Sequence, residues 1–283
     1  MTGRVATLLL LSLILLPCQG CVGRLFYHPD HKVYGSPADV GLKYEPVTFR
    51  SGDGTKLSGW FVPAVGTAKG TVIHFHGNAQ NMTAHFGFVN WLPAEGFNVF
   101  TFDYRGYGGS AGSPDRAGIA ADARAAIDYV RSRPDVDKNR LLVLGQSLGG
   151  AVALTAVGSG DRQGIRAVVS ESAFASYRGI VRDKIGVIPL LSLLKTPLSY
   201  LLIGDSLSPI DYVDRIAPIP LLIIHGSADE VIPPHHAEAL MARAREPKTL
   251  WLIPGAGHTE AFVSPASPYR ARLVAFFEEA LSR

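Results

Sequence analysis

Leu141-Leu142-Val143-Leu144-Gly145-Gln146-Ser147-Leu148-Gly149-Gly150-Ala151 joins a short apolar run to a run of small residues through a glycine-flanked serine. The apolar run predicts a buried parallel strand, and residues 151–157 predict a helix. Ser147 is then the centre of a G-x-S-x-G pentapeptide on a sharp turn that exposes its hydroxyl. The flanking glycines are needed because side chains there would collide with the strand and the helix. Glycine-rich turns also occur without chemistry, so the motif indicates catalysis only in the right context.

An acid and a histidine follow the serine in the order that this turn requires. Asp229 comes just after the apolar run 220–224, and His258 comes just after the apolar run 249–253. A nucleophile, an acid and a base, each beyond the end of a strand, have the chain order of one particular hydrolase architecture. We therefore predict a catalytic triad of Ser147, Asp229 and His258.

These motifs resemble the α/β-hydrolase superfamily, and the resemblance covers roughly Lys43 to the C-terminus. Two further strings are similar to the membrane-associated serine hydrolases of the α/β-hydrolase-domain group: His74-Phe75-His76-Gly77-Asn78-Ala79-Gln80-Asn81 and Phe102-Asp103-Tyr104-Arg105-Gly106-Tyr107-Gly108. The resemblance implies that the backbone N–H groups of Asn78 and Leu148 form the oxyanion hole, with Gly77 letting the chain approach the substrate closely.

The alternation of strand and helix patterns predicts the same fold. We expect residues 43–283 to form one α/β-hydrolase domain, with a mostly parallel central sheet and helices on both faces. An antiparallel hairpin turning at Asp53-Gly54 opens the sheet. Residues 173–218 interrupt the alternation, as a small helical cap would.

The cap is strongly apolar between residues 185 and 203. Pro189 and Pro197 break any continuous spanning helix, so we do not expect a transmembrane segment there. Three interpretations stay open: the leucines pack the cap onto the core, they face a membrane, or they line an acyl pocket. In the last case the lining residues would be Val187, Ile188, Leu191 and Leu194.

Other charged and polar residues near the strand ends have less specific patterns. Glu171 follows the predicted strand 165–170 and is the alternative to Asp229 as the triad acid. By family resemblance, Asp103 and Arg105 are expected to brace loops. His74 and His76 would share a strand face, but a pair without a third ligand does not make a metal site. We expect no metal and no organic cofactor.

Composition bounds the remaining possibilities. The chain has 283 residues and 47% hydrophobic content, which suits one large core. Its net charge is +3, and the charged residues are interspersed along the chain, without the basic runs of nucleic-acid binders. Nucleic acid is therefore not an expected partner. Cys18 and Cys21 are the only cysteines, which leaves the folded domain without a disulfide.

The first 21 residues have the pattern of an export signal. Arg4 precedes a run of apolar residues, 5–16, that is too short to span a bilayer comfortably. Cys18-Gln19-Gly20-Cys21 resembles a bacterial lipobox, although Cys18 stands where that pattern prefers leucine. We expect lipidation at Cys21, with an uncleaved anchor or ordinary secretion as alternatives.

Residues 22–42 are expected to be an extended tether between the membrane and the domain. The location that follows is the periplasmic side of a bacterial membrane, and the outer membrane in a Gram-negative cell because Val22 rather than an acid follows the cysteine.

The triad predicts an acyl-enzyme on Ser147 that is formed from a small-molecule ester or thioester with an acyl or lipid-like group. A peptidase or amidase could use the same triad. A third possibility is a membrane-tethered protein that uses the fold only for binding, and the intact triad argues against it.

Overall fold

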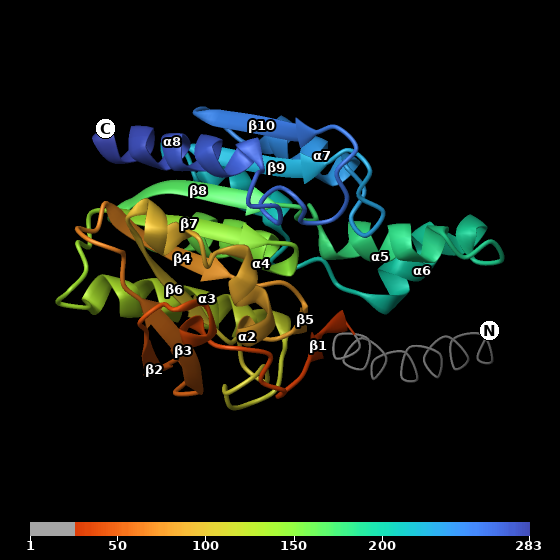
Figure 1. The fold of residues 1–283 in the computed structure, drawn as a ribbon. Coiled ribbons are helices and arrows are strands. Elements are labelled where there is room, and N and C mark those ends of the chain that lie inside the picture. Colours follow the sequence, from red (N-terminus) through yellow and green to blue (C-terminus); the bar gives the residue numbers. More distant parts are fainter. Residues whose placement is uncertain (1–25) are drawn as a thin grey trace, which may run out of the picture.

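An eight-stranded sheet runs through the molecule (Figure 1). The computed structural model describes residues 26–283, so the predicted signal segment and Cys21 lie outside the described residues. In chain order the strands are β2 (Glu45–Arg50), β3 (Lys56–Val62), β4 (Gly70–Phe75), β6 (Phe97–Phe102), β7 (Leu141–Gln146), β8 (Ile165–Glu171), β9 (Leu221–Gly226) and β10 (Lys248–Ile253). Their order across the sheet is β10-β9-β8-β7-β4-β6-β3-β2.

The direction of the strands places the functional loops on one edge. β2 and β3 form the expected antiparallel hairpin, and β3 is also antiparallel to β6. The six strands β6, β4, β7, β8, β9 and β10 are parallel to one another. The carboxyl ends of these six strands therefore meet at the same edge of the sheet, where open α/β sheets bind their ligands.

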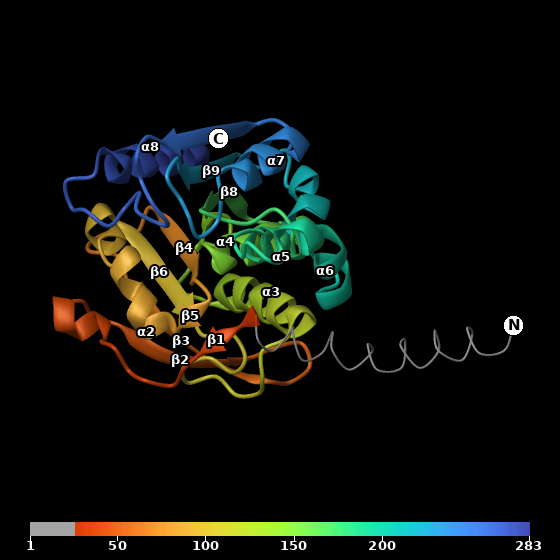
Figure 2. The same cartoon turned by 90° about the vertical axis from the view of Figure 1, so that its right-hand side faces the viewer.

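Successive side chains of a strand point to opposite faces of the sheet. Both faces are buried here, each in its own core cluster. In β7, Leu141 and Val143 belong to one core cluster, and Leu142 and Leu144 belong to the other. The first cluster is covered by α3 (Arg116–Ser132), α4 (Leu148–Ser159) and α7 (His235–Arg243), and the second by α2 (Met82–His85) and α8 (Pro268–Ser282) (Figure 2). This arrangement is the predicted α/β-hydrolase fold.

Helix α3 shows why these segments are helical. Asp115 accepts a hydrogen bond from the backbone N–H of Gly118 and so caps the first turn. Ile119, Ala123 and Ile127 recur at helical spacing and are buried against the sheet. Helix α2, by contrast, is short: it ends at His85, and the 3₁₀ turns η2 (Phe86–Phe88) and η3 (Leu92–Glu95) follow.

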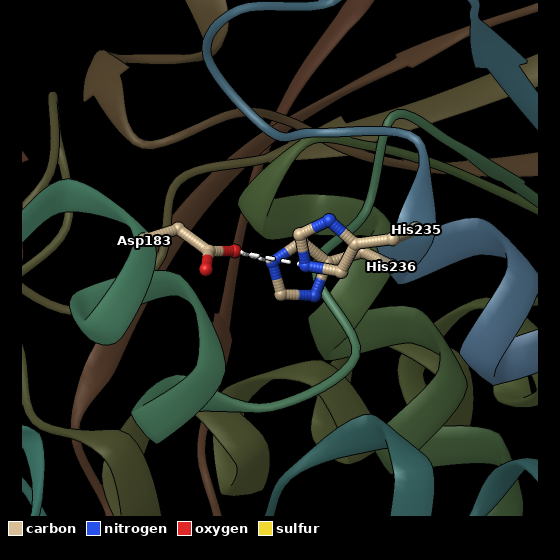
Figure 3. Close-up of side chains that lie close together, drawn as sticks. All are labelled: Asp183, His235 and His236. Atoms are coloured by element: carbon tan, nitrogen blue, oxygen red, sulfur yellow. Dashed lines mark hydrogen bonds and ion pairs between the residues drawn. The ribbon is translucent and has the colours of Figure 1, made fainter. Parts of the chain in front are cut away.

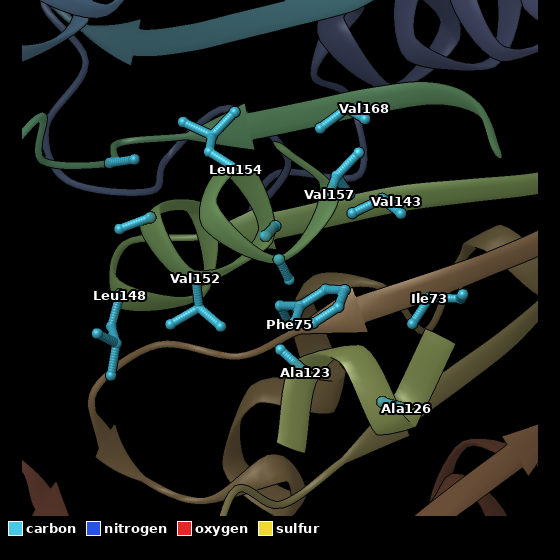
Figure 4. Packing of buried hydrophobic residues seen from close by; sticks show 14 of the residues in the cluster. Ile73, Phe75, Ala123, Ala126, Val143, Leu148, Val152, Leu154, Val157 and Val168 are labelled. Atoms are coloured by element: carbon cyan, nitrogen blue, oxygen red, sulfur yellow. The ribbon is translucent and has the colours of Figure 1, made fainter. Parts of the chain in front are cut away.

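Helix α4 packs against the sheet among buried apolar side chains (Figure 4). At its start it lies closer to the sheet than residues with side chains would allow. Every residue from Leu148 to Val157 is buried, as expected for a helix that is apolar all round. A Cβ atom on Gly149 would lie 2.0 Å from the backbone oxygen of Phe75, and one on Gly145 would lie 2.3 Å from the backbone oxygen of Gly149. The start of α4 therefore lies directly against the ends of β4 and β7.

The cap consists of α5 (Tyr177–Gly186), the 3₁₀ turn η4 (Ser192–Leu194) and α6 (Lys195–Leu202), all between β8 and β9. Figure 1 shows α5 and α6 projecting beyond the carboxyl ends of the strands. Val187, Ile188, Leu191 and Leu194 are exposed. These four side chains do not line the cavity at Ser147, so the acyl-pocket interpretation is wrong for them, whereas Ile185 and Ile203 at the two ends of the apolar run are buried.

No helix within residues 26–283 is long and apolar enough to cross a bilayer. The described part of the expected tether, residues 26–42, also differs from an extended linker. Tyr27 is buried, and Phe26 makes edge-to-face contacts with Phe174 and Tyr177. Strand β1 (His28–Pro29) pairs in parallel with β5 (Ala79–Gln80), and the 3₁₀ turn η1 (Pro37–Val40) follows. Two aromatic side chains and a strand pairing thus fasten this segment to the domain.

The contact at Gly149 gives a test of the packing. Gly149→Ala should lower the free energy of unfolding by about 2 kcal/mol, because the new methyl group meets backbone atoms that cannot rotate away. Gly87→Ala is the matched control, since a Cβ there has no neighbour within 4 Å. Urea unfolding of both variants measures the difference, and equal stabilities would contradict the packing described here.

Candidate active site

Ser147 lies on a strained turn at the carboxyl end of β7. Its φ and ψ angles are 55° and −120°, a region that residues other than glycine rarely adopt. The turn is held because the N–H of Ser147 donates to the backbone oxygen of Glu171, 2.8 Å away on β8. Strain of this kind persists only where surrounding contacts impose it, and it often marks functional sites.

The structure brings Ser147 together with the acid and histidine predicted from the sequence. His258 lies in the loop after β10, and its Nε2 is 2.9 Å from the Oγ of Ser147. The Nδ1 of His258 is 2.8 Å from the Oδ2 of Asp229, which lies in the loop after β9. Each neighbouring pair is thus within hydrogen-bonding distance, as proton transfer from serine to histidine requires.

Asp229 is held as a buried acceptor. Its Oδ1 accepts hydrogen bonds from the backbone N–H groups of Val231 and Ile232, at 2.9 and 2.8 Å. Burial by itself would raise the pKa of Asp229, but the hydrogen bonds from His258 and Ile232 outweigh it and keep that pKa below its usual value. A charged, oriented carboxylate therefore lies behind the histidine.

Glu171, the alternative acid, has other partners. Its Oε2 accepts a 2.6 Å hydrogen bond from Nε2 of Gln146, and its Oε1 accepts from the backbone N–H of Ala261, 2.9 Å away. Burial raises the pKa of Glu171 to about 6. Ala261 belongs to the loop that carries His258, so Glu171 links this loop to the end of β7.

The link continues into the sheet through a histidine whose partners the sequence does not reveal. Nε2 of His74 is 3.1 Å from the Oε1 of Gln146, and its Nδ1 is 3.2 Å from the Oγ1 of Thr101. Burial lowers the pKa of His74 to about 3, so the ring is neutral and donates from Nε2. A buried polar row thus runs from Thr101 to the histidine loop. In the sequence, the feature that could have indicated this row is a histidine, His74, in the otherwise apolar strand β4.

Asp103 and Arg105 connect loops to neighbouring elements through their side chains. The carboxylate of Asp103 accepts hydrogen bonds from the backbone N–H groups of Met82 and Gly109. The guanidinium of Arg105 lies 2.8 Å from the carboxylate of Asp122 in α3. Both residues are buried, and they connect the loops after β4 and β6 to neighbouring elements.

Asn78 lies beside Ser147 at the expected place. Its side-chain amide donates a 2.6 Å hydrogen bond to the backbone oxygen of Phe26, and its Oδ1 accepts from the N–H of His28. A Cβ on Gly77 would lie 3.7 Å from the Cβ of Ser147, so this loop passes close to the serine. The role of the Asn78 and Leu148 N–H groups as an oxyanion hole stays a prediction.

A largely apolar cavity of about 360 Å³ opens onto Ser147. The lining residues come from the N-terminal segment, the nucleophile turn, the cap and the loop after β9: Phe26, His28, Asn78, Ser147, Leu148, Phe174, Ile180, Val181, Lys184, Val231 and Ile232. A second cavity of about 260 Å³ shares Ser147 and also reaches His258. His28 lines both cavities.

One further cluster could in principle hold a metal (Figure 3). The Nε2 atoms of His235 and His236 lie 2.9 and 3.0 Å from Oδ2 of Asp183 on the cap helix α5. The backbone N–H of Ala175 donates to Nδ1 of His236, so the proton of this ring is on Nε2. Metal binding at Nε2 would need the opposite tautomer. The cluster fits a hydrogen-bonded brace between α5 and α7 better than a metal centre.

Known proteins that are similar to this chain identify its family. A family model described as serine aminopeptidase, S33, matches residues 66–207, about half of the chain. The uncharacterised protein YfhR of Escherichia coli K12 is 44% identical over 99% of this chain and 96% of its own length. The α/β-hydrolase domain-containing protein WAV2 of Arabidopsis thaliana is 34% identical over 86% of this chain and 82% of its own.

Among solved structures, an esterase of Pyrococcus furiosus superposes with a TM-score of 0.73 at 24% sequence identity, covering 90% of this chain and 98% of the esterase. At this identity the likeness concerns the fold. Together with the family match and the two sequence relatives, it leads to one conclusion: the chain belongs to the serine aminopeptidase S33 family of α/β hydrolases.

Proposed function

We propose that this hydrolase is a serine hydrolase that cleaves carboxylic ester or thioester bonds through an acyl-enzyme on Ser147. One observation carries the proposal: Ser147, His258 and Asp229 form a continuous hydrogen-bonded row, with distances of 2.9 and 2.8 Å, at the foot of an apolar cavity. A protein that uses the fold only for binding has no need to keep a serine in a strained turn beside this histidine.

In the proposed reaction His258 acts first as a base. The Oγ of Ser147 adds to the acyl carbonyl carbon while its proton passes to Nε2 of His258. Asp229 holds the ring in position and stabilises the imidazolium that forms. The tetrahedral intermediate then expels the alkoxide or thiolate, which takes the proton back from His258. Water attacks the acyl-enzyme by the same route and releases the carboxylic acid.

The negative charge on the tetrahedral intermediate needs donors that are already in position. We assign this role to the backbone N–H groups of Asn78 and Leu148. Support comes from their location: both residues line the cavity with Ser147, and Leu148 is the first residue of α4, where a helix has N–H groups without intrahelical acceptors. The side-chain bonds of Asn78 to the segment 26–28 fix its loop.

The cavity favours an uncharged, apolar acyl group over the free amino terminus of a peptide. An aminopeptidase needs a carboxylate to bind the positive charge of that amine. No acidic residue is among the described residues lining either cavity, and Lys184 contributes a positive charge instead. Ile180, Val181 and Ile232 provide apolar surface that would bind a short or medium acyl chain.

We also propose that the mature protein is an exported lipoprotein tethered through Cys21. The support is the sequence pattern at residues 1–21 together with the position of Phe26, the first described residue, at the cavity. A tether of this kind would keep the active site near acyl groups in a membrane.

Ser147→Ala should abolish ester hydrolysis and labelling by a fluorophosphonate probe, because only the hydroxyl provides the nucleophile. The melting temperature should stay close to that of the wild type. Hydrolysis is measured with matched p-nitrophenyl esters, thioesters and anilides of increasing acyl length. Turnover by the variant near the wild-type rate would refute the mechanism, and faster cleavage of anilides than of esters would favour an amidase.

Cys21→Ser should abolish incorporation of a clickable fatty acid and release the protein from membranes, because the thiol is the proposed acylation site. Cys18→Ser serves as the matched control and should keep the label. Labelling of the Cys21 variant, or soluble wild-type protein, would disprove the tether.

A further inference from the structure

The end of the cap carries a large apolar surface without a partner among the described residues. Its members lie in the turn after α5 and along α6: Val187, Ile188, Leu190, Leu193, Leu194 and Leu201. Leu190 and Leu193 are 91% and 93% exposed, so the described residues cover almost none of either side chain. We call residues 187–201 the cap tip. Apolar patches of this kind mark sites of contact with a protein or a membrane.

The cap tip projects beyond the ends of the strands (Figure 1), and the charged residues within it and nearest to it in the sequence are positive. Residues 184–204 contain no Asp or Glu, and the charged residues among them are Lys184 and Lys195. Lys184 is in the last turn of α5, and Lys195 begins α6, so a positive charge stands on each side of the apolar turn. Apolar side chains flanked by lysine are typical of segments that insert shallowly between lipid headgroups.

The cap tip also adjoins the opening of the active site. Ile180, Val181 and Lys184 of α5 line the cavity at Ser147, and the exposed turn begins just after this helix. Phe26, where the described chain begins, lines the same cavity. The described chain therefore begins on the side of the molecule that carries the cap.

We propose that the cap tip docks on the surface of an anionic lipid bilayer. A second copy of the chain fits less well, because two facing cap tips would bring Lys195 of both copies together, and residues 187–201 contain no acidic residue. The segment 1–25 also fits less well, because its charged residues, Arg4 and Arg24, are both positive, like the lysines at the cap tip. A bilayer offers an apolar layer for Leu190 and Leu193 and phosphate groups for Lys184 and Lys195. This inference does not rest on the proposed chemistry.

The test uses full-length protein and hydrogen exchange of peptides within residues 187–203, which reports on the cap tip whatever the N-terminus does. Vesicles of phosphatidylcholine with phosphatidylglycerol should slow this exchange, and high salt should weaken the effect. Vesicles of phosphatidylcholine alone should protect less. The double variant Leu190→Ser/Leu193→Ser should lower the affinity of the cap tip for vesicles by roughly a hundredfold.

The matched control is Val33→Ser/Val65→Ser, which removes two apolar side chains that are 73% and 65% exposed outside the cap. It should keep the protection by vesicles. Exchange that vesicles leave unchanged would overturn the proposal. Protection without vesicles would also overturn it: dependence on protein concentration would then indicate a second copy, and independence from it would indicate the segment 1–25.

Discussion

The contact between the start of α4 and the carbonyl of Phe75 is the constraint on which the active site depends. Gly149 permits it, because any larger residue would place its Cβ inside that carbonyl. With the helix held so close to β4, the chain must turn sharply at Ser147 and accept a positive φ. The strain in that turn is therefore offset by the packing of α4, in which every residue from Leu148 to Val157 is buried.

Two buried carboxylates, Asp229 and Glu171, lie at the same edge of the sheet. Their partners differ, so one has a place in the proposed reaction and the other stabilises the structure around it. Asp229 contacts His258 directly, whereas Glu171 reaches the histidine loop only through the backbone of Ala261. Gln146 and His74 extend the second connection into the sheet. The nucleophile and the base thus come from loops that are joined below the site by polar bonds protected from water, which strengthens them.

The sequence predicted the parts of this structure that local patterns specify. The apolar runs 165–170, 220–224 and 249–253 correspond to β8, β9 and β10, and their ends lie within two residues of the observed bounds. Ser147, Asp229 and His258 could be placed since each follows a strand. Which carboxylate meets the histidine depends on side-chain directions across β7 to β10, and the orientation of the cap leucines depends on the turn after Gly186. Neither is encoded in a short pattern.

The central claim is that Asp229, and not Glu171, is the acid of a working triad. It is tested most directly by kcat/KM for one ester with Asp229→Asn and Glu171→Gln, compared at pH 7. Asp229→Asn should lower kcat/KM by about 10⁴-fold, following the serine-protease precedent. Glu171→Gln should cause a much smaller loss, because that side chain reaches the histidine only through its loop. A larger loss for Glu171→Gln, at an unchanged melting temperature, would contradict the central claim.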